Sequence, residues 1–311
     1  MTEQRSSNLV GVIIPFIIFT GIWGSTWIVI RDQLAVVPAQ WSVTYRFAIA
    51  AVAMAALTLL RGEKLTLGPG GVTAAIGIGV SQFVCNFNGV YLAERYITSG
   101  LVATVFALLL IPNTLLAWAM LGHRPDRRFL LWSIPSIAGV VLLFVHELRE
   151  NATNLEAIAL GIGFTFVGIL GASFANVFQA REWVRKHNLF ALLAWSMAIG
   201  AVCDALIAFA LAGPPVFEPR LGYVAGLLYL ALAASALAFS LYFPIVRRIG
   251  PAKAAYSSVM VPLIAMSFST WLEDYRWTPL TIAGVVLALG GMVGALTSGA
   301  SKSPLPPPDA G

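Results

Sequence analysis

The sequence predicts an all-α integral membrane protein of ten transmembrane helices, arranged as two inverted five-helix repeats. Three observations predict this fold class: an apolar composition, ten apolar runs of spanning length, and an internal repeat. Of the 311 residues, 59% are hydrophobic and only 11% are charged, and the mean hydropathy is +0.84. Soluble domains are about half apolar and about a quarter charged, so this composition indicates a chain that resides in a lipid bilayer.

The apolar residues form long runs separated by short loops. Crossing the hydrocarbon core of a bilayer takes roughly 20 apolar residues in a helix. Runs of that length cover residues 9–30, 41–60, 71–93, 97–119, 129–146, 157–180, 189–212, 223–246, 252–272 and 279–297. Transmembrane strands would alternate polar and apolar residues, whereas these runs are apolar on every side, so helices are predicted. The loops leave no room for a soluble catalytic domain, and function is expected inside the bilayer.

The positive charges predict the orientation of the chain. Thirteen Lys and Arg residues lie at the N-terminus, in alternate loops and in the tail, five lie in the opposite loops, and Arg46 falls inside a run. Because positive charge collects on the cytoplasmic side, both termini are predicted to be cytoplasmic. This pattern accounts for the net charge of +5, so no nucleic-acid partner is predicted. The Pro-rich segment 298–311 is expected to be a disordered cytoplasmic tail.

An internal repeat covers most of the chain. The hexapeptide I-A-G-V-V-L occurs at 137–142 and again at 282–287, and T20-G-I-W-G-S-T-W27 corresponds to V167-G-I-L-G-A-S-F174. Ordered matches of this kind predict that residues 9–146 and 157–297 are two copies of one five-helix unit. Because five is odd, the second copy enters the membrane from the opposite face, and the repeats are inverted. Two such halves can exchange conformations, which gives the alternating access of a transporter.

These features resemble the EamA-type members of the drug/metabolite transporter superfamily. The motifs are the G-x-W-G-S segment at 21–25, a mid-helix proline in each half, and Leu272-Glu273-Asp274 before a G-V-V-L helix. The first half departs from the pattern, with Leu121-Gly122-His123 where an acidic residue is usual. The resemblance covers residues 9–297 and implies a transporter of the bacterial inner membrane.

The likeness within the superfamily is to aromatic amino-acid exporters. It implies alternating-access export of amino acids, aromatic or other neutral ones, or of similar small metabolites, by a chain expected to be able to function as a monomer. Export of drugs or other metabolites in exchange for protons is the alternative, followed by a channel-like facilitator.

Polar residues near the helix centres are the candidates for substrate binding. Gln82 and Asn86 share one stripe of the run 71–93 with two glycines, and the alternative role of this stripe is helix packing. Ser235 occupies the repeat position of Gln82, and Tyr242 lies two turns further on. Amides and hydroxyls offer donors for a carboxylate and acceptors for an ammonium group, so these four residues are predicted to bind substrate.

Tryptophans in the first run offer an aromatic wall. Trp23 is predicted to contact an apolar or aromatic substrate, and the six spans 9–30, 71–93, 97–119, 157–180, 223–246 and 252–272 are expected to surround the cavity. Trp27 lies closer to the membrane surface and is assigned to an interfacial belt. Trp118, Trp195 and Trp271, at or near run ends, are expected to be anchors.

Two ionisable residues and two prolines stand inside the predicted spans. Arg46 and Asp204 lie at matching depths. Either they form a structural ion pair, or Arg46 is the partner of a substrate carboxylate and Asp204 is a proton-coupling carboxylate. Pro112 and Pro262 occupy equivalent positions and are predicted to form a hinge in each repeat.

The sequence gives no sign of an enzyme. The three histidines lie in loops or at run ends, and no hydrolase, metalloprotease or nucleotide-binding motif is present. No catalytic residue, metal site or cofactor is predicted, and Cys85 and Cys203, both inside runs, are expected to be ordinary packing residues.

Overall fold

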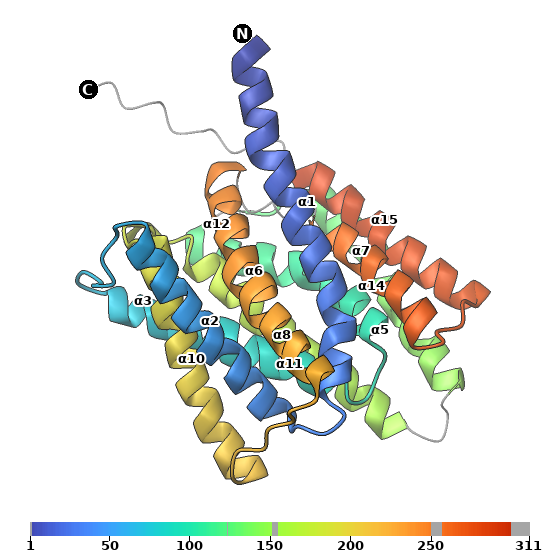
Figure 1. The fold of residues 1–311 in the computed structure, drawn as a ribbon. Coiled ribbons are helices and arrows are strands. Elements are labelled where there is room, and N and C mark those ends of the chain that lie inside the picture. The colour runs from blue at the N-terminus through green and yellow to red at the C-terminus, as the bar shows by residue number, and fades with distance from the viewer. Residues whose placement is uncertain (1, 123, 151–154, 250–256, 300–311) are drawn as a thin grey trace.

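A computed structural model describes residues 2–122, 124–150, 155–249 and 257–299, and all regular structure in these residues is helical (Figure 1). Each apolar run of the sequence overlaps helix in the described part of the chain. Helices uninterrupted along their length are α1 (Thr2–Gln33), α2 (Ala39–Leu60), α7 (Arg127–Glu150), α8 (Leu155–Phe178), α10 (Leu189–Ala212), α14 (Ser257–Leu272) and α15 (Pro279–Gly299). A short helix, α9 (Glu182–Arg185), lies in the loop before α10.

Three further apolar runs change from α-helix to another helix type near the middle. The run 71–93 consists of α3 (Gly71–Ile78), a π-helix η1 (Gly79–Asn86) and α4 (Phe87–Ala93). Its counterpart in the second half consists of α11 (Leu221–Leu228), a π-helix η3 (Tyr229–Leu237) and α12 (Ala238–Ile249). The run 97–119 consists of α5 (Ser99–Phe106), a 3₁₀ turn η2 (Ala107–Leu109) and α6 (Leu110–Leu121). π-Helical segments are rare and often mark functional sites.

Length and composition qualify six helices of the described residues to cross a membrane. They are Ile13–Gln33, Ala39–Leu60, Ser99–Leu121, Leu155–Phe178, Leu189–Ala212 and Leu221–Ile245, and two shorter apolar helices cover Met260–Leu272 and Pro279–Ala295. Large apolar side chains lie exposed on their outer surfaces, among them Leu60, Leu206 and Val286, as expected where lipid replaces water. The predicted tail begins inside α15, and residues 300–311 lie outside the described residues, as do His123 and 252–256.

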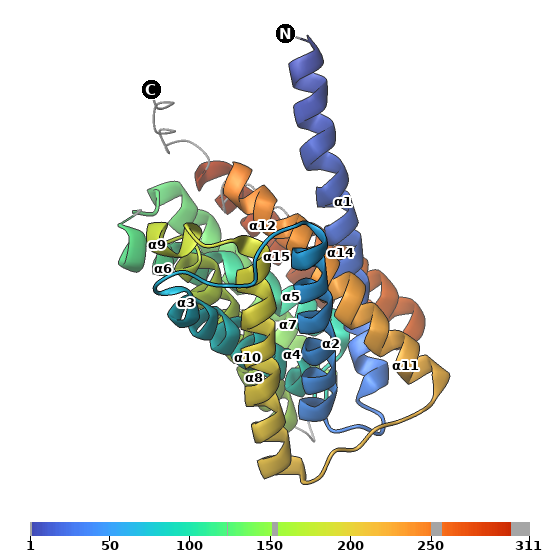
Figure 2. The same ribbon diagram turned by 60° about the vertical axis from the view of Figure 1, so that its left-hand side comes forward.

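The main helix contacts join the first half of the chain to the second. Helix α2 packs along α10, as both views show (Figures 1 and 2), and α7 packs along α15. Helix α1 contacts α14 and α12, while its counterpart α8 contacts α6 and α4. The core therefore lies between the two halves, not within each of them.

The two copies of the repeated hexapeptide face each other. A Cβ atom on Gly139 would lie 2.5 Å from the carbonyl oxygen of Gly284, and one on Gly284 would lie 3.0 Å from the carbonyl oxygen of Gly139. Only glycine permits such an approach of two helix backbones, and small residues drive helix association in membranes for this reason. The two copies of the hexapeptide, one on α7 and one on α15, therefore form the two sides of one helix contact.

Candidate functional site

A cavity of about 140 Å³ lies between the two halves. Its walls come from α1, α2, η1, α4, the α5–η2–α6 run, α8, α12 and α14. The lining side chains are mainly aromatic or amide-bearing, and they are Trp23, Thr26, Trp27, Ile30, Arg46, Gln82, Asn86, Phe87, Val90, Phe106, Leu109, Leu110, Asn113, Ala172, Asn176, Phe239, Tyr242, Ser257 and Val261. The cavity thus brings together Trp23, Gln82, Asn86 and Tyr242 from the sequence prediction, with Arg46 added by α2.

Arg46 is the charged residue of the lining, and its side chain is buried, with 1% exposed. Its Nε donates to Ser235 Oγ at 3.0 Å and its Nη1 donates to Tyr91 Oη at 3.4 Å. The guanidinium carbon lies 4.4 Å from the centre of the Phe87 ring. The described residues supply no carboxylate partner for Arg46, so a cation held in place by neutral groups faces the cavity.

Amide side chains contribute unpaired acceptors to the same cavity. Gln82 and Asn86 both belong to the π-helix η1, and both are at most 5% exposed. Asn86 Oδ1 and Asn113 Oδ1 are buried and accept no hydrogen bond from the described residues. An unsatisfied buried acceptor is costly, and these two therefore suit a ligand that brings donors.

Aromatic side chains form one wall of the cavity. Trp23 lies edge-on to Tyr242 and Phe239, at 4.9 and 5.4 Å between ring centres, and its Nε1 donates to the carbonyl oxygen of Ala234 at 3.1 Å. Trp27 was expected in the interfacial belt, and this prediction is wrong: Trp27 is 7% exposed and lines the cavity beside Phe106. The sequence gives its depth along α1, but its direction is decided by the helices that surround α1.

Ser235 lies behind the cavity wall. It is fully buried in η3, where its Oγ also donates to the carbonyl oxygen of Leu230 at 2.8 Å. This five-residue separation is that of a π-helix. Ser235 therefore positions Arg46 and does not line the cavity in this structure.

Asp204 and Arg46 do not form the ion pair that the sequence left open. Asp204 is fully buried on α10, where Oδ1 accepts from Asn88 Nδ2 at 2.6 Å, and Oδ2 has no partner among the described residues. Asp204 does not belong to the cavity lining and links α10 to α4. The other alternative, in which Arg46 binds a substrate carboxylate and Asp204 couples transport to protons, stays a prediction.

The two prolines differ in their local structure. Pro112 lies in the first turn of α6, directly after the 3₁₀ turn η2, whereas Pro262 lies inside the uninterrupted helix α14. Their neighbours Asn113 and Val261 line the cavity. A bend at either proline would therefore move a cavity residue, and the hinge in each repeat stays a prediction.

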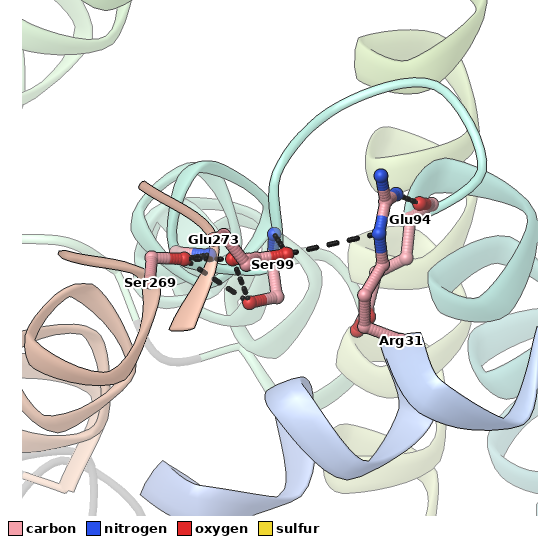
Figure 3. Close-up of polar contacts among 6 residues, drawn as sticks. Arg31, Glu94, Ser99, Ser269 and Glu273 are labelled. Atoms are coloured by element: carbon pink, nitrogen blue, oxygen red, sulfur yellow. Dashed lines mark hydrogen bonds and ion pairs between the residues drawn. The ribbon is translucent and has the colours of Figure 1, made fainter. Parts of the chain in front are cut away.

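A second polar site lies where the ends of α1 and α14 meet the start of α5 (Figure 3). We call it the Arg31–Glu273 cluster, and it consists of Arg31, Ser99, Ser269 and Glu273. Arg31 Nε lies 3.7 Å from Glu273 Oε1, and Ser99 Oγ donates to Glu273 Oε2 at 2.6 Å. Ser269 Oγ donates to the same oxygen. The cluster ties the first half to the second and borders a hollow of about 460 Å³.

Sequence reasoning missed several residues of these sites. Asn113 and Asn176 are amides inside apolar runs, and that polarity was a usable signal. Phe106 and Phe239 gave no signal, because a phenylalanine in an apolar helix most often faces lipid or the core. Glu94, which follows α4 directly, lies between two predicted runs and was not singled out, although the structure buries it completely.

Comparisons with known proteins give a family and a fold. The profile of the EamA-like transporter family matches residues 11–145 and, separately, residues 157–297. A crystal structure of a protein with 18% sequence identity superposes with a TM-score of 0.66 and covers 96% of this chain and 99% of its own. At that identity the superposition supports the fold alone.

Three relatives are similar over most of the chain. The "Uncharacterized transporter YoaV" of Bacillus subtilis is 22% identical over 88% of this chain and 92% of its own length. The "Uncharacterized inner membrane transporter YedA" of Escherichia coli is 28% identical over 86% of this chain and 88% of its own. A "Probable amino-acid metabolite efflux pump" of Salmonella typhimurium is 23% identical over 87% of this chain and 90% of its own length.

Proposed function

The chain belongs to the EamA-like transporter family, and on that premise we propose that it exports amino acids, aromatic or other neutral ones, across the bacterial inner membrane by alternating access. The central cavity is the substrate site, with Arg46, Gln82, Asn86, Trp23 and Tyr242 as contacts. Both termini are cytoplasmic, and the export unit is the monomer.

One observation carries this proposal: the lining of one cavity contains a single cation and two unpaired acceptors. Arg46 is the charged lining residue, and the acceptors are Asn86 Oδ1 and Asn113 Oδ1. A free amino acid presents a carboxylate for the guanidinium and ammonium donors for the amide oxygens. A substrate with only one of these groups would leave a buried polar group of the cavity unpaired.

The size and walls of the cavity support a small substrate. A dry cavity of about 150 Å³ holds a molecule the size of benzene, whereas drug-sized ligands occupy about 300–1,000 Å³. The 140 Å³ cavity with its wall of Trp23, Phe239 and Tyr242 therefore suits an amino acid with an apolar side chain better than a drug. A ring of charged residues, as in many selective channels, does not form around it in the described residues.

The helix pairing supports two inverted repeats, residues 9–146 and 157–297. The family profile matches the two halves separately, and contacts occur in equivalent pairs, such as α1 with α12 and α8 with α4. In this arrangement the ends of α1 and α14 lie on the outer side, where the Arg31–Glu273 cluster joins them. The conformation described here is then one with its outer side closed.

Transport into liposomes tests the proposal. Purified protein should take up labelled phenylalanine or tryptophan in a saturable manner, with counterflow, and with and without a pH gradient to detect proton exchange. Tryptamine, which lacks the carboxylate, and indole-3-propionate, which lacks the ammonium group, should each compete much less well than tryptophan. Equal competition by all three would contradict the assignment of amino acids, and flux without saturation or counterflow would indicate a channel.

Replacing Gln82 by alanine is expected to raise the apparent KM for the amino acid about 2- to 10-fold, the value of one neutral hydrogen bond. The matched control is Gln179→Ala, because Gln179 is a buried amide that does not belong to the cavity lining. Transport kinetics in liposomes give both numbers. An unchanged KM in folded Gln82→Ala protein would remove Gln82 from the site.

Single cysteines should show the inverted arrangement of the repeats. Gly68 and Pro219 lie exposed in loops that are equivalent in the two halves, so Gly68→Cys should react with an impermeant label only from the cytoplasmic side. Pro219→Cys should react only from the outer side, in a background with Cys85→Ala and Cys203→Ala. Labelling of both positions from the same side would refute inverted repeats.

A further inference from the structure

Glu94 is a buried carboxyl group that the cavity does not use. It follows the last residue of α4, its side chain is 0% exposed, and neither Oε1 nor Oε2 has a hydrogen-bond partner among the described residues. A charged carboxylate without partners is far more expensive to bury than a neutral carboxyl group. In the conformation described here, the neutral form of Glu94 is therefore favoured.

Charged and titratable groups reach Glu94 from four helices. Arg31 of α1 donates to the backbone carbonyl oxygen of Glu94, not to its carboxyl group (Figure 3). Glu273 at the end of α14, Arg46 of α2 and Tyr91 of α4 also act on it electrostatically. Burial raises the pKa of Glu94 well above its usual range, the Glu273 carboxylate raises it further, and the two arginines oppose the shift.

Glu94 interacts both with the Arg31–Glu273 cluster and with Arg46 of the cavity lining. Arg31 contacts Glu94 and Glu273 at once, so the same side chain holds the loop that carries Glu94 and the end of α14. Toward the cavity, Tyr91 Oη donates to Gln33 Oε1 at 3.3 Å and accepts from Arg46. Tyr91 and Glu94 are three residues apart and face the same side of their helix end.

Separation of α1 from α14 would break the contact between Arg31 and Glu273 and admit water to Glu94. With water present, the carboxyl group would lose its proton near the ordinary pH of a glutamic acid. Closure would return it to a buried site where neither carboxyl oxygen has a hydrogen-bond partner among the described residues. The free energy of closing therefore contains the free energy of protonating Glu94.

We infer that Glu94 is a proton-binding site that couples closure of the outer side of the protein to the uptake of one proton. The inference rests on the proposed alternating access and adds to it a named proton site. Protonation adds H⁺ to the carboxylate from the outer solution, and reopening releases the same proton.

The sign of the resulting pH dependence follows from linkage. The closed state binds more protons than the open state at any pH between the ordinary and the raised pKa, so closure becomes more favourable as the pH falls, by up to about tenfold per pH unit. Above the raised pKa Glu94 is charged in both states, so its contribution to the equilibrium no longer changes with pH. A shift toward the open state as the pH falls would instead point to a different titrating group.

The test measures the distance between the ends of α1 and α14. Val36 and Trp271 are exposed there, and spin labels on Val36→Cys and Trp271→Cys, in the background without native cysteines, report their separation by pulsed electron spin resonance. Between about pH 5 and pH 9, the spin-labelled protein with Glu94 intact should shift from short to long distances as the pH rises. A distribution that is independent of pH, or that shifts in the opposite direction, would overturn the inference.

Neutral variants identify the responsible group. Glu94→Gln and, as a second variant in case the first does not fold, Glu94→Met should keep the short distance at every pH. The control Glu63→Gln, in the loop 61–70, should keep the pH response. A folded neutral variant that follows the pH response of the parent would refute a role for Glu94. The distance measurement needs no substrate, so a failure of amino-acid transport in liposomes would contradict the proposed function and leave this result standing.

Discussion

Replacing Arg46 by glutamine is expected to lower the apparent affinity for an amino acid by about 10- to 100-fold, because a buried hydrogen bond to a charged group contributes about 1.5–3 kcal/mol. Arg46 is the charged residue of the cavity lining and has no carboxylate partner among the described residues. Its contacts with Ser235 and Tyr91 hold the guanidinium in place. Competition kinetics in liposomes measure the change.

Two comparisons make this prediction specific. Arg61→Gln is the matched control, because the guanidinium of Arg61 also lies 4.4 Å from the centre of an aromatic ring, that of Phe190, but outside the cavity. It should leave transport unchanged. The amine analogue without a carboxylate should compete equally well against the parent and the Arg46→Gln variant. If the Arg46→Gln substitution lowers the apparent affinity for the analogue as much as that for the amino acid, Arg46 supports the structure and does not bind the carboxylate.

Replacing Gly139 by alanine is expected to destabilise the protein by about 1–3 kcal/mol, the usual cost of overpacking. The added methyl group would overlap the backbone of α15 at Gly284 and Ala288. Backbone atoms cannot move aside as a side chain end can, so α7 and α15 must separate. A lower midpoint of thermal unfolding in detergent would show the effect.

The control for this variant lies on the partner helix. A Cβ atom on Gly290 of α15 would meet nothing within 4 Å, and alanine has a higher helix propensity than glycine. Gly290→Ala should therefore leave the midpoint unchanged or raise it. If Gly139→Ala behaves like Gly290→Ala, the close approach of the repeated hexapeptides does not contribute to stability.

The sequence predicted the positions of the apolar helices and several residues of the cavity lining. Run length and composition locate the apolar helices, because a bilayer demands about 20 apolar residues in each span. Polarity inside such a run indicated Gln82, Asn86 and Arg46, all of which line the cavity. A phenylalanine in an apolar run carries no comparable signal, so Phe106 and Phe239 went unnoticed, and Trp27 was misplaced because its depth along the run does not give its direction.

By itself the sequence determined that this is a helical membrane protein with an internal repeat, since the lengths of hydrophobic runs and the ordered matches depend only on the order of residues in the chain. Only the tertiary structure decided which residues meet. Arg46 and Asp204 have matching depths along their helices, yet Arg46 faces Ser235 and Asp204 faces Asn88. Depth follows from position in a run, whereas direction depends on how helices from the two halves pack together. For the same reason Glu94, beside the end of an apolar run, is buried by side chains from distant parts of the chain.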